Sequence, residues 1–75
     1  MANIWKEYKP APGVLWQLEA LLAQEIGELA DILWLTTFDD GYIIRYRTDT
    51  KERATKAKFR VNVTGDVEDF ECLKL

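Results

Sequence analysis

Residues 32–48 have the sequence ILWLTTFDDGYIIRYRT, which predicts a β-hairpin. The two halves, residues 32–38 and 42–48, are rich in the β-branched and aromatic side chains that favour strands. The intervening DDG at 39–41 is a typical tight-turn sequence. These residues therefore predict two neighbouring strands of an antiparallel sheet.

Two more strands are predicted after the hairpin. Residues 49–55 form a polar connection, residues 56–63 alternate between apolar and polar side chains, and a turn at 64–66 leads into residues 67–75. Short connections place consecutive strands side by side. Residues 32–75 thus predict a four-stranded antiparallel β-meander.

In the second strand, the alternation of side chains predicts which face meets the core. Tyr42 and Tyr46 alternate there with Arg45 and Arg47, and we expect the aromatic side chains to face inward. The basic side chains expected together on the outer face of the two middle strands are Arg45, Arg47, Lys58 and Arg60.

The last two strands differ in how clearly they specify their faces. The predicted inner set of the third strand is Phe59, Val61 and Val63. The final strand permits two registers, because its inner side can hold either Phe70 and Cys72 or the set Glu71, Leu73 and Leu75.

A single amphipathic helix is predicted for residues 12–30. Apolar residues recur along it at spacings of three and four, which is typical of one buried stripe. They are Leu15, Leu18, Leu22, Ile26 and Leu29. Gly27 is the weak position in the helix interior. Residues 1–13 form an arm that leads into the helix. The predicted fold is α+β, one amphipathic helix packed on a four-stranded antiparallel β-meander, in one domain spanning residues 1–75.

The composition excludes several classes of site. The 75 residues include one cysteine, Cys72, and no histidine, so neither an internal disulfide nor a zinc site of the usual ligands is expected. A thiol nucleophile would also lack its base. Glu25 falls at the edge of the apolar stripe, and we expect its carboxylate to reach water. We therefore predict no enzyme, no metal and no cofactor.

The sequence also lacks the marks of a membrane or exported protein. The longest mostly apolar stretch, residues 14–35, contains four acidic residues, so no membrane span is predicted. The N-terminal residues carry neither the basic nor the apolar region of a secretory signal. We expect a cytoplasmic protein.

The charges are unevenly distributed along the chain. Residues 45–60 hold seven of the ten basic residues and only two of the thirteen acidic ones, while the whole chain has a formal net charge of −3. A segregated basic patch can attract an acidic partner despite that net charge. The alternative interpretation is a solvated polar face, partly neutralised by Asp69 or Glu71 on the neighbouring strand.

A second unusual surface is predicted on the helix. Small residues follow one line beside the apolar stripe, with a tryptophan at its head. The residues of this strip are Trp16, Ala20, Ala23 and Gly27. Small side chains allow another helix to approach closely, from a partner or from a second copy in a homodimer. The N-terminal arm is the other candidate to cover it.

The hairpin resembles a known family of proteins. Asp31-Ile32-Leu33, Thr36, Phe38-Asp39-Asp40 and Thr48-Asp49 are similar to the central hairpin of the phage-encoded uracil-DNA glycosylase inhibitors. Those proteins combine a helix with an antiparallel sheet, mimic DNA and occupy the binding cleft of the enzyme. They are strongly acidic and carry an acidic Glu-Ser edge segment, which we match to no stretch of this chain. The resemblance implies a phage-encoded inhibitor.

These features together favour a small non-enzymatic protein-interaction domain, either an adaptor or an inhibitor of a larger protein. The expected binding residues are the four basic residues of the outer face and the helix strip. The alternative is a nucleic-acid-binding domain that uses the same basic face. It ranks second because sheets that bind single strands display aromatic residues among the basic ones, and here the aromatic residues of the second strand alternate to the opposite face.

Overall fold

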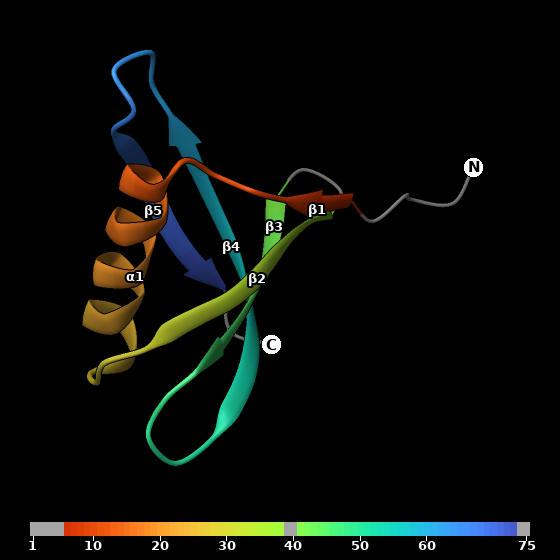
Figure 1. Ribbon diagram of the computed structural model, residues 1–75, viewed down its shortest axis with the longest axis vertical. Coiled ribbons are helices and arrows are strands. Elements are labelled where there is room, and N and C mark those ends of the chain that lie inside the picture. Colours follow the sequence, from red (N-terminus) through yellow and green to blue (C-terminus); the bar gives the residue numbers. More distant parts are fainter. Residues whose placement is uncertain (1–5, 39–40, 74–75) are drawn as a thin grey trace.

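The computed structural model describes residues 6–38 and 41–73 of the chain. One helix and a five-stranded antiparallel sheet form an α+β fold, which confirms the predicted class (Figure 1). The elements are β1 (Lys6–Tyr8), α1 (Pro12–Ile26), β2 (Asp31–Phe38), β3 (Gly41–Arg47), β4 (Glu52–Val61) and β5 (Val67–Leu73). The predicted turn residues Asp39 and Asp40 lie outside the described residues.

The sheet has five strands in the order β1-β2-β3-β4-β5, so the prediction of four was wrong. The additional strand, β1, comes from the N-terminal arm and pairs antiparallel with β2, with Glu7 opposite Thr36. Pro10 follows closely and cannot donate a backbone hydrogen bond, which limits the length of the strand. Three paired residues are too few to show an alternating pattern, so the sequence carried no signal for β1.

The helix begins at Pro12, as predicted, but ends at Ile26 rather than at residue 30. Gly27 is the C-cap, with φ 80°, and its N–H donates to the carbonyl oxygen of Ala23 at 2.8 Å. A left-handed residue at this position is the common way for a helix to stop, and glycine adopts it without strain. Leu29 therefore lies beyond the apolar stripe and is 87% exposed.

The core lies between α1 and the inner face of the sheet. Its buried apolar residues are Val14, Leu18, Leu22, Leu35, Ile44, Tyr46, Ala57 and Phe59. Tyr46 of β3 faces inward as expected. In β5, Phe70 and Cys72 pack against this core, which decides between the two registers left open by the sequence.

The third predicted strand starts and ends earlier than expected. β4 begins at Glu52 because the amide of Thr48 donates to the carbonyl oxygen of Lys51 at 2.8 Å, which closes a short turn before it. Its pairing with β5 shifts register between Lys58 and Arg60. Beyond this shift, Val61 is 38% exposed and Val63 is fully exposed, so their predicted place in the core was wrong.

Two polar side chains attach the helix to the sheet. Gln17 accepts a hydrogen bond from the amide of Val67 at 2.9 Å and donates to the carbonyl oxygen of Gly65 at 2.8 Å. Glu19 accepts one from the amide of Ile32 at 2.9 Å. The helix thus bonds to β2 on one side and, on the other, to the start of β5 and the turn before it. No helix of the described residues covers the opposite face of the sheet.

Among the described residues, no helix has the length and the apolar character needed to cross a membrane.

Candidate functional site on the outer face of the sheet

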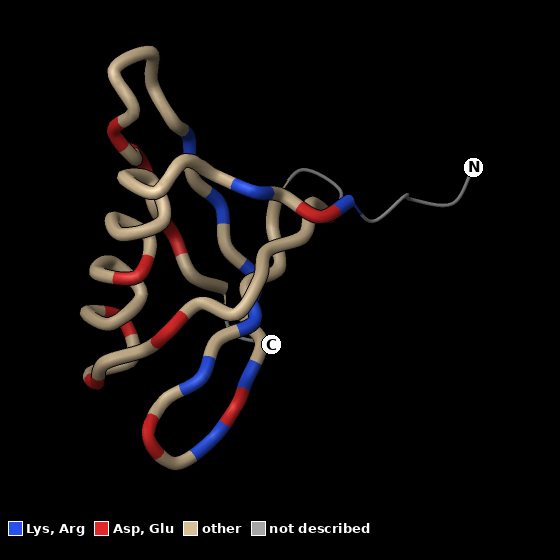
Figure 2. The backbone as a smooth tube through the Cα atoms, in the orientation of Figure 1, with Lys and Arg blue, Asp and Glu red and all other residues tan. Residues whose placement is uncertain are grey.

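The four basic residues predicted to share the outer face are all exposed on β3 and β4. We call the face of the sheet turned away from α1 the outer face. Figure 2 shows basic positions along β4 and the hairpin that joins it to β3, and acidic positions along α1 and β5, with further acidic positions on that hairpin and on β2. The charge separation expected from the sequence is therefore only partial in space, because Arg47 lies opposite Asp31 and Glu52 in the ladder.

The basic residues differ in their ionic partners. Arg60 contacts Asp69 at 2.6 Å and Glu68 at 3.5 Å, both on β5. Its hydrogen bond to Asp69, and then the charges of both carboxylates, raise the pKa of the Arg60 guanidinium. The neutralisation by Asp69 that the sequence allowed is thus present at this end of the sheet. Lys58 lies directly opposite Glu71 in the ladder.

Two aromatic residues of β2 lie on the outer face beside basic residues of neighbouring strands. The Arg45 guanidinium carbon is 5.7 Å from the centre of the Trp34 ring, and Lys56 Nζ is 5.1 Å from that of Phe38. Ile43 lies opposite Lys56 in the ladder. We call Trp34, Phe38, Ile43, Arg45 and Lys56 the aromatic–basic patch. Cation–π pairs at exposed sites contribute about 0.5–1 kcal/mol each, so they hold the charged groups in place without removing their charge.

The sequence interpretation missed Trp34 and Phe38 as outer residues. A β-bulge in β2 shifts the register between Ile32 and Trp34, so that Ile32 pairs with Tyr46 on the inner side while Trp34 pairs with Arg45 on the outer side. One extra residue in a strand moves every later side chain to the other face. The run ILWL gave no sign of this bulge, because all four side chains are apolar.

A buried hydroxyl lies beneath this patch. Thr36 is 8% exposed, and its Oγ1 has no hydrogen-bond partner among residues 6–38 and 41–73. It pairs with Ile43 in the ladder, between the positions of Trp34 and Phe38. Burial of an unsatisfied hydroxyl costs about 1–3 kcal/mol. This hydroxyl therefore opposes the stability of the sheet.

The helix strip lies on the other side of the molecule. Trp16 is 70% exposed, Ala20 is exposed and Ala23 is partly buried, all on α1. Gly27 closes the helix as its C-cap rather than lying in its interior. The described part of the arm does not cover Trp16. The two predicted surfaces are therefore separate, on opposite sides of the sheet.

Arg53 also belongs to the basic stretch, yet it lies on the inner side of the sheet. It pairs with Tyr46 in the ladder and lines a cavity beneath the helix together with Glu25 and Cys72. Glu25 itself is exposed, as expected for a residue at the edge of the apolar stripe. The basic stretch thus places basic side chains on both faces of the sheet.

The described residues contain no group of three or more side chains able to hold a metal ion. Comparison with protein-family models, with curated proteins and with solved structures found no significant match to this chain.

Proposed function

We propose that this chain is a small non-enzymatic protein-interaction domain, an adaptor or an inhibitor of a larger protein, and that it docks through its outer face. The observation that carries the proposal is the contact of Trp34 and Arg45. Trp34 keeps 38% of its surface exposed while the Arg45 guanidinium carbon lies 5.7 Å from the centre of its ring. Tryptophan and arginine are among the residue types most enriched in the energetic centres of protein interfaces.

The local charge of the aromatic–basic patch favours an acidic partner. Arg45 and Lys56 lie opposite uncharged residues in the ladder. Arg47, in contrast, lies opposite Asp31 and Glu52, and Arg60 is already paired with acidic residues of β5. We therefore place the contact at the aromatic–basic patch rather than across the whole set of four basic residues. Complementary charge there would accelerate association and make it sensitive to salt.

Proteins captured by the immobilised chain from a lysate, identified by mass spectrometry, test this proposal. Arg45→Glu should abolish the capture of a specific partner. Lys51→Glu is the matched control, because it makes the same charge change at an exposed position in the turn before β4. Equal capture of that partner by the wild type and by both variants would contradict docking through this face.

A second candidate function is the binding of single-stranded nucleic acid through the same patch. The specific observation in its favour is that Trp34 and Phe38 lie among the basic side chains, where bases can stack on them. Fluorescence anisotropy with a labelled oligothymidylate tests it. Binding should weaken steeply with salt, with a slope set by the number of phosphates contacted. Binding that persists at high salt would favour the protein partner.

The resemblance of residues 31–49 supplies one enzyme to test directly, uracil-DNA glycosylase. Release of uracil from DNA by that enzyme should stop when the chain is added in stoichiometric excess. Full activity of the enzyme in the presence of excess chain would exclude this target. It would not contradict the proposal that the chain is a protein-interaction domain with another partner.

A further inference from the structure

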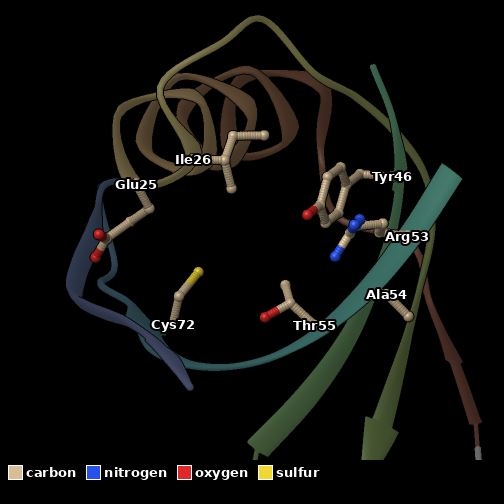
Figure 3. Close-up of a pocket in the computed structure, with 7 residues that line it drawn as sticks. All are labelled: Glu25, Ile26, Tyr46, Arg53, Ala54, Thr55 and Cys72. Carbon is tan, nitrogen blue, oxygen red and sulfur yellow. The ribbon is translucent and has the colours of Figure 1, made fainter. Parts of the chain in front are cut away.

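A cavity of about 490 Å³ lies between the C-terminal end of α1 and the inner side of the sheet. Figure 3 shows side chains from the helix, β3, β4 and β5 around it. Pockets that bind small molecules typically measure about 300–1,000 Å³. The cavity is therefore large enough for a ligand of several non-hydrogen atoms.

One wall of the cavity carries a cation and a hydroxyl. The Arg53 guanidinium and the Tyr46 hydroxyl both point toward the centre of the cavity (Figure 3). Neither ion pair found among the described residues involves Arg53. An arginine with its donors available, next to a phenol, is the arrangement that binds a carboxylate through charge-assisted hydrogen bonds.

The remaining walls are apolar or hold neutral groups. Ile26 projects from the helix toward the centre, and Cys72 lies opposite on β5 (Figure 3). Burial, and then the nearby Glu25 charge, raise the pKa of the Cys72 thiol, so it stays neutral at physiological pH. The Thr55 hydroxyl is engaged with the carbonyl oxygen of Leu73 at 3.2 Å. This half of the cavity therefore favours a hydrocarbon group.

Glu25 is the acidic group on the cavity wall. Its carboxylate points away from the centre, on the side of β5, while Arg53 points inward (Figure 3). The positive charge is thus the one presented to a ligand. Glu25 still opposes an anion at long range, so its removal should tighten the binding of one.

We propose that this cavity binds a carboxylate that bears a short branched hydrocarbon chain. The carboxylate contacts Arg53 and Tyr46, and the hydrocarbon lies against Ile26 and Cys72. A free carboxylic acid and the C-terminal residue of another polypeptide share this chemistry. The cavity lies on the inner side of the sheet, so the proposal is independent of docking through the outer face, and either can fail without the other.

Cys72 is the only cysteine of the chain and lines the cavity, so its reaction with iodoacetamide reports occupancy. The probes are N-acetyl-leucine, which represents a chain terminus, and 4-methylpentanoate, which represents a free acid. Their matched controls are N-acetyl-leucinamide and 4-methylpentanamide, which have the same shape without the charge. Saturating carboxylate should slow alkylation several-fold, while the amides should leave the rate unchanged.

Three variants separate the proposed contact from general attraction of anions. Arg53→Gln should weaken the protection by about tenfold or more, because a charged hydrogen bond is lost. Arg47→Gln makes the same charge change on the outer face and should have little effect. Glu25→Gln should strengthen the protection. Circular dichroism checks that each variant is folded.

Protection by the amides equal to that by the acids would overturn the proposal, as would unchanged protection in Arg53→Gln. Absence of protection, together with unchanged backbone amide shifts of Ile26 and Cys72, would also overturn it. Where the acids do protect, stronger binding of N-acetyl-leucine assigns the cavity to a chain terminus. Equal or stronger binding of 4-methylpentanoate assigns it to a free acid.

Discussion

Thr36 is a single residue that opposes the stability of the sheet. Its hydroxyl is buried and has no partner in the described part of the chain, while its backbone pairs with both neighbouring strands. The side chain retains the β-branched shape that suits a strand. The cost therefore lies in the oxygen alone, and a residue of the same shape without it should remove that cost.

Thr36→Val should raise the free energy of unfolding by about 1 kcal/mol, because the unsatisfied hydroxyl is replaced by a methyl group. For a domain of this size, that corresponds to an increase in Tm of about 4–8 °C. Thr37→Val is the matched control, since the Thr37 hydroxyl donates to the carbonyl oxygen of Lys6 at 3.5 Å. Thermal melts of both variants check the prediction. A loss of stability in Thr36→Val would mean that its hydroxyl does find a partner in solution.

Cys72 should make the stability of the protein depend on pH in the alkaline range. Its thiol pKa is raised in the folded state, so the unfolded chain releases this proton first as the pH rises. The contribution of the thiol to the free energy of unfolding is complete below the ordinary thiol pKa of about 8.5. It is lost as the pH rises through the pKa that the thiol has in the folded state. We expect the urea midpoint to fall above that pH, and to fall less in Cys72→Ser.

Tyr8 supplies the internal check on this assignment. Burial, and then the neighbouring Tyr42, raise the pKa of its phenol, so its own effect begins above about pH 10 in both proteins. Urea titrations between about pH 8 and 9.5 therefore isolate the thiol. Parallel curves for the wild type and Cys72→Ser in that range would contradict the role of the thiol.

At the level of elements, aromatic side chains connect four of the five strands across the inner face. Tyr42 of β3 stacks on Phe59 of β4 at 4.2 Å between ring centres, and Tyr8 of β1 lies 5.2 Å from Tyr42. Phe59 lies 6.2 Å from Phe70 of β5. Such pairs add about 0.5–1.5 kcal/mol each beyond their buried area. This row attaches the three-residue strand β1, whose few backbone pairs would hold it weakly.

The attachment of α1 to the sheet depends on one amide side chain. Gln17→Ala should lower the free energy of unfolding by about 1–3 kcal/mol, because two partly buried backbone groups, at Gly65 and Val67, lose their partner. Gln24→Ala makes the identical change of helix propensity at an exposed position of α1. It should alter stability by no more than about 0.5 kcal/mol. Urea unfolding of the pair measures the difference, and equal effects would show that the attachment contributes nothing.

At the level of the whole molecule, the sheet separates two surfaces of different character. The outer face carries basic and aromatic side chains, and the exposed side of α1 carries Trp16 and small residues. Trp16 is 70% exposed in the monomer, so burial of its ring contributes little to the stability of the isolated chain. Association through the helix would cover this residue and leave the outer face accessible to another partner.

We expect the chain to form a homodimer through the strip that begins at Trp16. Light scattering during size-exclusion chromatography should give a mass that rises toward twice 8.7 kDa as the protein concentration increases. Trp16→Glu should remain at the monomer mass, because a charge would then be buried in the interface. Because position 16 is exposed in the monomer, the Trp16→Glu variant should fold normally. A concentration-independent monomer for the wild type would contradict the prediction.

The sequence by itself determined the α+β class, the start of the helix at Pro12, and the inward side of β3. These features depend on local periodicity and on turn chemistry, which a chain expresses through neighbouring residues. The exposure of the four predicted basic residues follows from the same alternation. Their role in binding stays a prediction.

Only the tertiary structure decided the fifth strand, the bulge in β2 and the direction of Arg53. The three residues of β1 form a strand because they pair with the free edge of β2. No pattern within those three residues predicts this pairing. A bulge inside an apolar run leaves the composition unchanged while it exchanges the two faces. For this reason, the sequence pattern did not predict that Trp34 lies on the outer face. The orientation of its side chain is set by the pairing of β2 with β3 rather than by the residues beside it in the chain.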